Sequence, residues 1–243
     1  MMQKLLVAFD FDHTIIEANS DIVIRKLIPN NEIPDDVKHL YRSDGWTTYM
    51  QEIFKILHRI GISKEKIIQT CHTFEETSGM INLITELKKT LGADVIIISD
   101  SNSVFIEEWL KYHNLSRHID RVYTNPAKFN EDGLLTIQKY HNQDWCKLST
   151  KNLCKGYILE SYIKEQIVKK GCYNVVAYVG DGKNDLCPIL KLRSVDHCFP
   201  RIGYTLMNSI NEVQASKSHL IQAKIHPWND GEEVLKILKQ ICT

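Results

Sequence analysis

The chain has 243 residues, 43% of them hydrophobic and 25% charged, which suits one large domain or one domain carrying an insertion. Thirty basic residues balance thirty acidic ones, so the charge gives no reason to expect nucleic acid or an anionic membrane as a partner. No apolar run approaches the roughly 20 residues that cross a bilayer, and the seven irregularly spaced cysteines indicate reduced thiols in a cytoplasmic protein.

Three short apolar segments predict buried parallel strands, at residues 4–9, 95–98 and 175–179. The first lacks the small-residue cleavage site of a signal peptide. Each segment ends in polar or acidic residues and is followed by helix-spaced apolar residues. Alternating strands and helices predict an α/β fold, a Rossmann-like parallel sheet with helices on both faces, whose ligands bind at the carboxyl ends of the strands.

The segment between the first two strands is too long for a simple crossover. Its helix-spaced apolar residues occupy three stretches, 21–27, 46–60 and 64–72. We therefore expect a core made of residues 1–20 and 80–243, with a helical cap inserted at 21–79. Residues 80–91 predict the helix that returns to the core, and residues 130–133 predict the turn of a small hairpin.

The sharpest motif stands at the end of the first strand. Asp10 and Asp12, followed by Thr14, leave the strand toward the same side. In such a pair one carboxylate can attack phosphorus, while the other protonates the leaving oxygen and later activates water. The pattern therefore predicts that Asp10 and Asp12 share these two roles, one as nucleophile and the other as acid–base group.

A second motif follows the third strand. Asp181, between Gly180 and Gly182, and Asp185 can face one hard cation, and carboxylate oxygens are ligands that Mg²⁺ prefers. The alternative is a polar turn in which an aspartate caps a helix. The neighbouring Asp-x-Asp motif favours the metal site.

The end of the second strand is polar as well. Ser99, with the backbone N–H groups of the helix start that follows, can bind phosphate, and a capping role for Ser101 or Ser103 is compatible with this. Lys155 is the candidate cation that neutralises the phosphate, and Lys151 competes with it.

In their order these motifs resemble the four motifs of the haloacid dehalogenase superfamily. Longer strings are similar to the phosphoethanolamine/phosphocholine phosphatase family and its pyridoxal-phosphate phosphatase sibling. Among them are Asn19-Ser20-Asp21, Thr124-Asn125-Pro126-Ala127, Lys151-Asn152-Leu153-Cys154-Lys155 and Pro200-Arg201-x-Gly203-Tyr204. The similarity spans nearly the whole chain and favours the pyridoxal-phosphate sibling.

The resemblance implies roles for five aspartates. Asp10 is the nucleophile and a Mg²⁺ ligand, Asp12 is the proton donor and binds Mg²⁺ through its backbone carbonyl, and Asp181 is a further metal ligand. Asp21 and Asp100 fall where the family contacts substrate, and the alternative is that they cap the helices that follow them.

Two positions beside the expected metal ligands stay open. Asp185 is a candidate for the shell behind the metal ligands, whereas Ser99 and Lys155 are expected to bind the phosphate of the substrate. Lys183 adds a positive charge so close to the expected metal that the charge balance there is open.

Cysteine chemistry is a competing hypothesis. Cys187 and Arg193 have the spacing of a cysteine-phosphatase loop, but the residues between them form an amphipathic helix without glycine. His141, Cys146 and Cys154 raise the question of Zn²⁺, yet they lack a Cys-x-x-Cys pair, which favours ordinary thiols.

Aromatic residues of the expected cap allow two interpretations. Tyr41, Trp46, Tyr49 and Phe54 form either a wall that binds a cation or the packed core of the cap, and we favour core packing.

The function expected from the sequence is a Mg²⁺-dependent phosphomonoester hydrolase that forms an aspartyl phosphate. Its substrate is a small phosphorylated metabolite bearing a cation, with pyridoxal phosphate favoured. The alternatives are a phosphoethanolamine/phosphocholine phosphatase and a phosphotransferase with the same nucleophile. A non-catalytic binding module is disfavoured because Asp10 and Asp12 are both present. No protein partner is implied.

Overall fold

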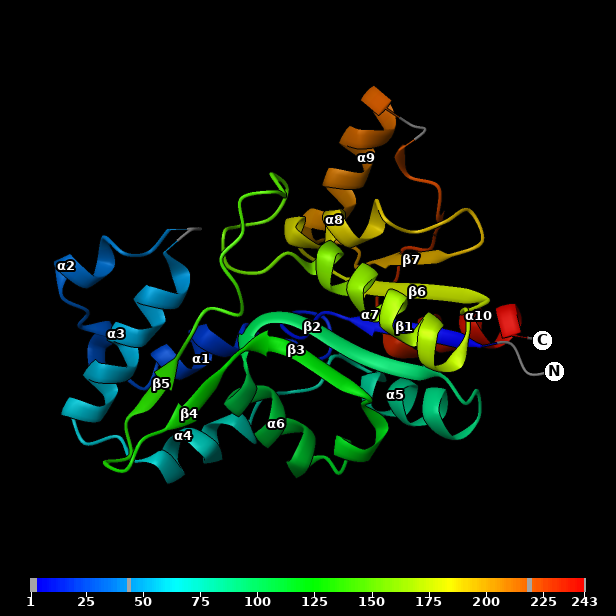
Figure 1. Cartoon of the computed structure of the whole chain (residues 1–243). Coiled ribbons are helices and arrows are strands. Elements are labelled where there is room, and N and C mark those ends of the chain that lie inside the picture. The colour runs from blue at the N-terminus through cyan, green and yellow to red at the C-terminus, as the bar shows by residue number, and fades with distance from the viewer. Residues whose placement is uncertain (1–3, 43–44, 218–219, 243) are drawn as a thin grey trace.

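The computed structural model describes residues 4–42, 45–217 and 220–242. A six-stranded sheet forms the centre of the larger part of the molecule, and a smaller lobe, called the cap lobe below, stands at its side (Figure 1). The strand order is β3-β2-β1-β6-β7-β8, and every pair of neighbours is parallel. The predicted Rossmann-like α/β fold is confirmed.

The strands are short and mostly buried. Their bounds are β1 (Leu5–Phe9), β2 (Asp94–Asn102), β3 (Arg121–Asn125), β6 (Val175–Gly180), β7 (His197–Pro200) and β8 (Lys224–Ile225). Successive side chains of a strand point to opposite faces, so Leu5, Val7 and Phe9 enter one core cluster and Leu6 and Ala8 the other. The sequence located β1, β2 and β6 and missed the other three.

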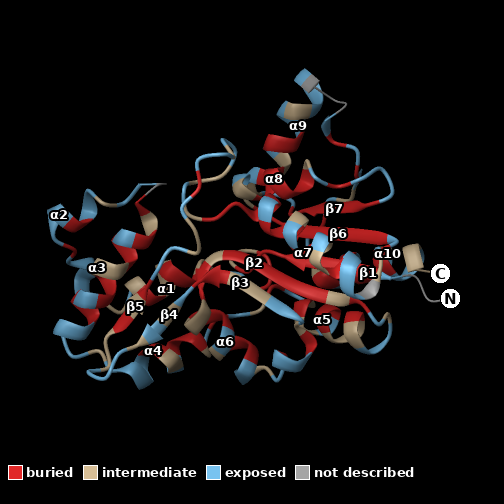
Figure 2. Ribbon diagram, viewed as in Figure 1, coloured by how far each residue is buried: buried red, intermediate tan, exposed pale blue. Residues whose placement is uncertain are grey.

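Two helical layers cover the sheet. One contains α5 (Met80–Lys89), α6 (Ser103–Tyr112) and α10 (Gly231–Cys242); the other contains α7 (Lys155–Lys170), α8 (Leu186–Ile189) and α9 (Thr205–Lys217). Buried residues follow the strands and the inner helix faces, while the outer helix faces are exposed (Figure 2). Within the described ranges, no helix combines the length and the hydrophobicity needed to cross a bilayer.

The cap lobe is built from two segments of the chain. One supplies α1 (Ser20–Arg25), α2 (Asp35–Lys38), α3 (Trp46–Arg59) and α4 (Lys64–Cys71); the other supplies the hairpin β4 (Ala127–Phe129) and β5 (Leu135–Ile137). Gln51 of α3 accepts a hydrogen bond from Ile137 N (2.9 Å) and donates one to Leu135 O (3.3 Å).

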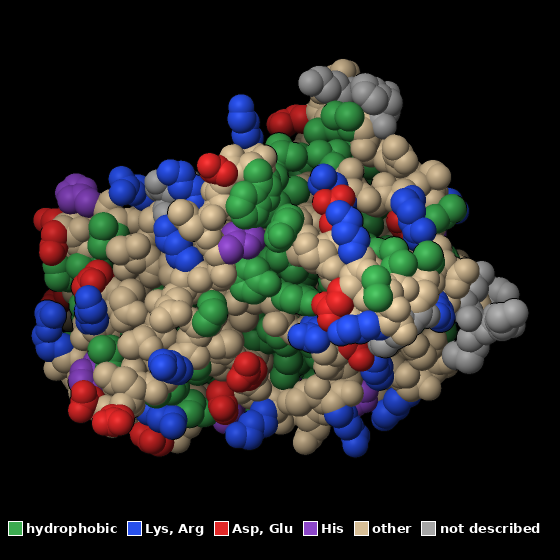
Figure 3. Space-filling model, in the orientation of Figure 1, with side chains coloured by type: hydrophobic (Ala, Val, Ile, Leu, Met, Phe, Trp, Pro, Cys, Tyr) green, Lys and Arg blue, Asp and Glu red, His purple; other side chains and the backbone are tan. Residues whose placement is uncertain are grey.

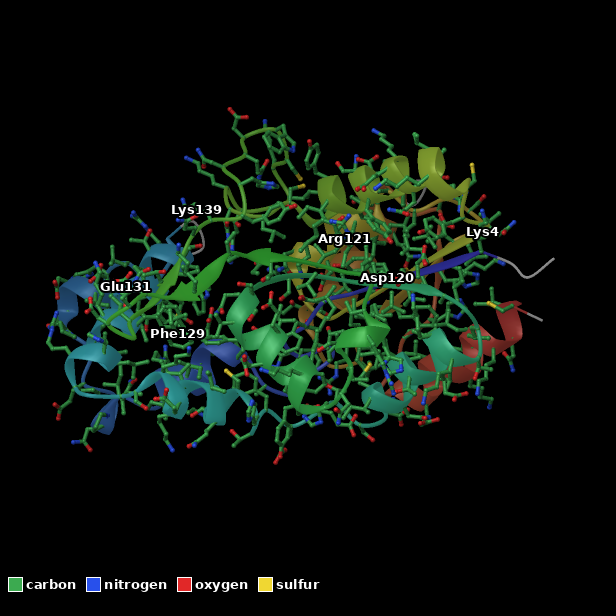
Figure 4. All side chains as sticks on the ribbon, turned by 60° about the horizontal axis from the view of Figure 1, so that its bottom comes forward. Lys4, Asp120, Arg121, Phe129, Glu131 and Lys139 are labelled. Carbon is green, nitrogen blue, oxygen red and sulfur yellow. The ribbon has the colours of Figure 1, made fainter. Side chains whose placement is uncertain are left out.

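The predicted turn at 130–133 therefore does form a hairpin, and it lies against the cap helices. Phe129 and Glu131 lie on this hairpin, while Asp120 and Arg121 mark the start of β3 in the core (Figure 4). The division predicted from the sequence, with the cap at residues 21–79, assigns this hairpin to the core. That division stays a prediction.

Candidate active site

A pocket of about 300 Å³ lies at the carboxyl edge of the central strands. The residues that line it come from the ends of β1, β2 and β6, from the cap lobe and from the segment before α7. Six of the residues expected at the site line this pocket: Asp10, Asp12, Asp21, Ser99, Asp100 and Asp181. The other two, Lys155 and Asp185, are completely buried and contact the pocket residues from behind.

Asp10 follows β1 directly. Its backbone N–H donates to Val179 O (3.0 Å), and its Oδ1 accepts from Phe11 N (2.7 Å). Its Oδ2 accepts from Lys155 Nζ. Burial raises the pKa of Asp10 well above its usual range; the charge of Lys155 opposes this shift, and nearby carboxylates add to it. The backbone of two adjacent strands thus fixes Asp10 beside a buried ammonium.

Lys155 is the first residue of α7 and is entirely buried. Besides Asp10, its ammonium contacts Asp185 Oδ1 at 2.7 Å. Burial alone would lower the pKa of Lys155, but the charges of Asp10 and Asp185 outweigh it and raise the pKa above its usual value. Lys151 is exposed. The structure thus brings Lys155, and not Lys151, to the Asp10 carboxylate.

Asp185 is saturated with hydrogen bonds. Its Oδ1 accepts from Lys155 and from Tyr178 OH (2.7 Å), and its Oδ2 accepts from the backbone N–H groups of Asp181 (3.0 Å) and Gly182 (2.9 Å). The turn is tight: a Cβ atom on Gly180 would come within 2.5 Å of Asp185 Oδ2. Asp185 therefore holds the loop after β6 in place.

Asp181 carries the second carboxylate that faces Asp10. Carboxylate oxygens of Asp10, Asp181 and Asp185 lie within 4.8 Å of one another. Thr14 Oγ1 donates to Asp181 Oδ1 (3.3 Å). Burial and the nearby Asp185 raise the pKa of Asp181 to about 7. This set of oxygen atoms suits a hard divalent cation.

Asp12 faces the cap side of the pocket. Its two oxygens accept from Ser20 N (3.0 Å) and Ser20 Oγ (3.1 Å) at the start of α1. Burial and the charge of Asp21 raise the pKa of Asp12 to about 8. The next residue, His13, has a positive φ of 55°, and Arg201 donates to its carbonyl (2.6 Å). This turn leads the chain away from the Asp12 side chain.

Asp21 is buried and Asp100 is partly buried, and each carboxylate has one buried oxygen atom without a hydrogen-bond partner. Trp46 Nε1 donates to Asp21 Oδ2 (2.5 Å), and Asn184 Nδ2 donates to Asp100 Oδ2 (3.1 Å). In both residues the Oδ1 atom accepts no hydrogen bond. Burial raises the pKa of Asp21 to about 7, and burial also raises the pKa of Asp100.

Neither residue caps a helix, so the capping alternative is wrong. Asn19 caps α1 by accepting from Ile22 N (3.0 Å), and Asn102 caps α6 by accepting from Phe105 N (3.2 Å). Asparagine side chains satisfy the free N–H groups of a first helical turn as well as aspartates do. Asp21 and Asp100 are thus left to face the pocket.

The phosphate-binding site expected at Ser99 differs from the prediction in where the following helix begins. β2 continues through Asn102, with an irregular register between Ile98 and Asn102, so α6 starts only at Ser103. Ser99 is buried and its Oγ accepts from Ser101 N (3.2 Å). The helix cap predicted at Ser101 or Ser103 is wrong, because Asn102 takes that position.

The aromatic residues of the cap divide between the two interpretations. Trp46 lines the pocket, whereas Tyr49 and Phe54 are buried in the core. Tyr41 is half exposed and packs edge-on against Trp46 and Tyr49. Of these four aromatic side chains, Trp46 is the one that lines the pocket and can contact a ligand there.

Comparisons with known proteins agree with the geometry of the site in indicating a phosphatase. The family model described as "Putative Phosphatase" matches residues 5–242. The chain belongs to this phosphatase family. Over 237 residues it is 38% identical to "Probable phosphatase phospho2" of Xenopus tropicalis and 35% identical to "Pyridoxal phosphate phosphatase PHOSPHO2" of Homo sapiens, in each case across 97% of this chain and 98% of the relative.

A second human relative, named "Phosphoethanolamine/phosphocholine phosphatase", is 32% identical across 98% of this chain and 89% of its own length. Among solved structures, "Phospho-Aspartyl Intermediate Analogue of Phosphoserine phosphatase" aligns with a TM-score of 0.63 at 20% identity, covering 98% of this chain and 99% of that one. The predicted haloacid dehalogenase fold and the prediction that the chain is a phosphatase are confirmed.

Several residues of the candidate site were not predicted from the sequence of this phosphatase. Asn184 binds Asp100, and Tyr178 binds Asp185, although Tyr178 reads in the sequence as one more apolar residue of β6. Thr150 lines the pocket from the segment before α7, and no local pattern marks it. Lys183 is exposed, so its side chain does not enter the cluster of carboxylates.

The cysteine-phosphatase alternative has no support in the structure. Arg193 binds Asp196 through two guanidinium nitrogens, at 2.9 and 2.7 Å, and therefore does not serve an anion near Cys187. Cys187 lies buried in the short helix α8.

Proposed function

We propose that this phosphatase requires Mg²⁺ and uses Asp10 as its nucleophile. Asp10, Asp181 and Asp185 bring three carboxylates together, and the ammonium of Lys155 contacts two of them, Asp10 and Asp185. Buried negative charge needs compensation. Asp10, Asp181 and the backbone carbonyl of Asp12 would hold the ion. Bound Mg²⁺ would neutralise the phosphate oxygens and orient the phosphoryl group for attack.

The protein's own groups then divide the proton chemistry. The Asp10 carboxylate attacks phosphorus, and Lys155 favours the ionised form of that carboxylate. Asp12, with its pKa raised to about 8, carries a proton near neutral pH and gives it to the departing alkoxide. In the second step the Asp12 carboxylate takes a proton from the water that hydrolyses the aspartyl phosphate, which restores both residues.

The free Oδ1 atoms of Asp21 and Asp100 are the observation that supports a substrate bearing a cation. A buried carboxylate oxygen without a donor is costly, so a ligand that brings an ammonium or a protonated ring nitrogen would offset that cost. The Trp46 indole in the same pocket offers a flat apolar surface beside Asp21. A planar, protonated pyridine ring suits both features, and we therefore propose pyridoxal phosphate.

Phosphoethanolamine or phosphocholine is the second candidate. Either one would satisfy the two carboxylates, and Trp46 could contact their cationic group through its ring face. The two candidates differ in shape, because only pyridoxal phosphate has a ring that can stack on the indole. A small phosphorylated metabolite is the substrate class in both cases.

The seven cysteines form no disulfide, which supports a cytoplasmic location.

The test is a comparison of kcat/KM for pyridoxal phosphate, phosphoethanolamine, phosphocholine and a phosphomonoester with a neutral leaving group, for the native protein and for Trp46→Leu. We expect pyridoxal phosphate to be the best substrate and to lose the most on Trp46→Leu. A native preference for the neutral compound would contradict the proposal. Comparing free phosphate with transferred phosphate in the presence of added alcohols separates hydrolysis from phosphotransfer.

A further inference from the structure

Three cysteines from two parts of the chain, the segment before α7 and the helix α8, meet behind the active site. Cys146 lies in the segment between β5 and α7, Cys154 is the residue before α7, and Cys187 lies in α8. The Sγ atom of Cys187 is 3.4 Å from that of Cys146 and 3.7 Å from that of Cys154. All three Sγ atoms lie within 4.8 Å of one another. No part of the phosphatase chemistry described above uses them.

Their spacing is that of thiolates around one ion. Zn–S bonds are about 2.3 Å long, so two sulfurs of a tetrahedral zinc site lie roughly 3.8 Å apart. The two measured separations, 3.4 and 3.7 Å, are close to that value. A buried cysteine that merely fills the core needs no second sulfur at this distance. Three sulfurs that converge from this segment and from α8 have the arrangement of a binding site.

We propose that Cys146, Cys154 and Cys187 bind one thiophilic d¹⁰ cation, Zn²⁺, with its fourth coordination position open to solvent. Cys146, Cys154 and Cys187 line a pocket of about 340 Å³ on the surface. No His, Asp or Glu of the described ranges joins the three thiols as a ligand group. The nearby His141 already accepts a hydrogen bond through Nε2 from Cys154 N (3.0 Å), so this nitrogen is occupied.

The surface above the cluster gives an ion a way in. Cys146 is partly exposed, whereas the other two thiols are buried. Trp145, Leu148 and Tyr157 surround the opening, each with about half of its surface exposed (55%, 50% and 50%). Figure 3 shows a band of hydrophobic side chains on this face, beside the boundary between the cap lobe and the core. Apolar surroundings favour thiolate binding to a metal over hydration of the ion.

The ion would connect the segment before α7 to the helix α8, close to the groups proposed for catalysis. Cys154 directly precedes Lys155, and Cys187 follows Asp185 by two residues. Lys155 and Asp185 form the 2.7 Å ion pair of the active site. The same segment supplies Thr150 to the wall of the active-site pocket. Bound Zn²⁺ would therefore stabilise the segment and α7 together.

Cd²⁺ is the probe that distinguishes thiolates from carboxylates, because only thiolate ligands give a ligand-to-metal charge-transfer band in the near ultraviolet. The full-length protein, kept reduced with a phosphine and saturated with Mg²⁺, is titrated with Cd²⁺, and Zn²⁺ is then added as a competitor. We expect the band to saturate at one Cd²⁺ per chain and to weaken only when Zn²⁺ is added in large excess, because thiolates bind the softer Cd²⁺ more tightly.

The variants separate this cluster from other thiols and from the active site. Cys146→Ser replaces the partly exposed ligand, and we expect it to weaken Cd²⁺ binding by more than the roughly 10–100-fold typical of losing an outer-sphere partner. Cys172→Ser, at an exposed cysteine elsewhere, and Asp181→Asn should both keep the native band. An unchanged band in Cys146→Ser, a band lost in Cys172→Ser, or no band at one equivalent of Cd²⁺ would overturn the proposal.

Because Zn²⁺ binds only to the folded cluster, native protein should also gain thermal stability on adding one equivalent of Zn²⁺, and Cys146→Ser should gain much less. Equal gains in the two proteins would place the ion elsewhere. Neither readout depends on catalysis, so failure of this proposal is distinguishable from failure of the proposed phosphatase mechanism.

Discussion

Lys155 Nζ lies 2.7 Å from Asp185 Oδ1, and both side chains have no exposed surface. The same ammonium contacts Asp10, so one buried cation connects the end of β1, the start of α7 and the loop after β6. Removing one member of such a pair leaves a buried charge without compensation, so under the proposed mechanism stability and catalysis would depend on the same atoms.

Lys155→Met should destabilise the protein by about 3–5 kcal/mol, because Asp10 and Asp185 then keep their burial and lose their cation. It should also lower kcat, since Asp10 loses the charge that favours its ionised form. Denaturant unfolding gives the free energy, and steady-state kinetics on folded protein gives the rate. Lys151→Met is the matched control: its exposed side chain should change the stability by no more than about 0.5 kcal/mol. Equal effects of the two substitutions would contradict this assignment.

Asp10→Asn should abolish turnover and preserve the fold, because an amide is nearly the same size as a carboxylate but a poor nucleophile. We expect kcat to fall by about 10³-fold or more. Acid quenching of the native enzyme during turnover, followed by mass spectrometry, should find a phosphoryl group on the peptide that contains Asp10. The idea fails if folded Asp10→Asn keeps most of the native rate, or if the phosphoryl group is found on another residue.

Stability should depend on pH and Mg²⁺ together. Burial raises the pKa of Asp12 to about 8 and the pKa values of Asp21 and Asp181 to about 7. Between their ordinary values of about 4 and these raised values, the folded protein holds protons that the unfolded chain has released. Without metal, the free energy of unfolding should therefore fall as the pH rises from about 5 to about 8.

Mg²⁺ needs ionised carboxylates, so its stabilising effect should grow over the same pH range. Thermal unfolding with a chelator and with Mg²⁺, at about pH 5 and about pH 8, measures both effects. We expect the larger Mg²⁺-dependent increase in Tm at the higher pH, and chelation should stop turnover at either pH. An increase that is equal at the two pH values, or turnover that persists after exhaustive chelation, is incompatible with a carboxylate metal site.

Asp21→Asn and Asp100→Asn should reduce kcat/KM selectively for cationic substrates. If the free Oδ1 atoms contact the cation, each substitution should cost about 1–3 kcal/mol in transition-state binding for pyridoxal phosphate. A phosphomonoester with a neutral leaving group should lose much less. Asn102→Ala serves as a control, because loss of this helix cap weakens folding without changing the order of substrates. Equal losses for both substrates, or none, would show that these carboxylates do not recognise the leaving group.

Local sequence patterns were enough to predict the fold class, and they point to Asp10 and Asp12 as the proposed catalytic pair. Runs such as Leu5–Phe9 are apolar at every position and end in acids, which only a strand buried on both faces explains. Asp10 and Asp12 stand two residues apart, so backbone geometry alone places both at the strand end. Local patterns of this kind need no knowledge of the remaining chain.

The contacts of the distant carboxylates and thiols follow from the tertiary structure and could not be read from local patterns. Asp21 meets Trp46 across 25 residues and Asp100 meets Asn184 across 84, and these partners leave one oxygen of each carboxylate free in the pocket. Cys187 reaches Cys146 from 41 residues away. Such contacts depend on how the whole core packs, because chain segments far apart in sequence have no local backbone geometry that fixes their side chains against each other.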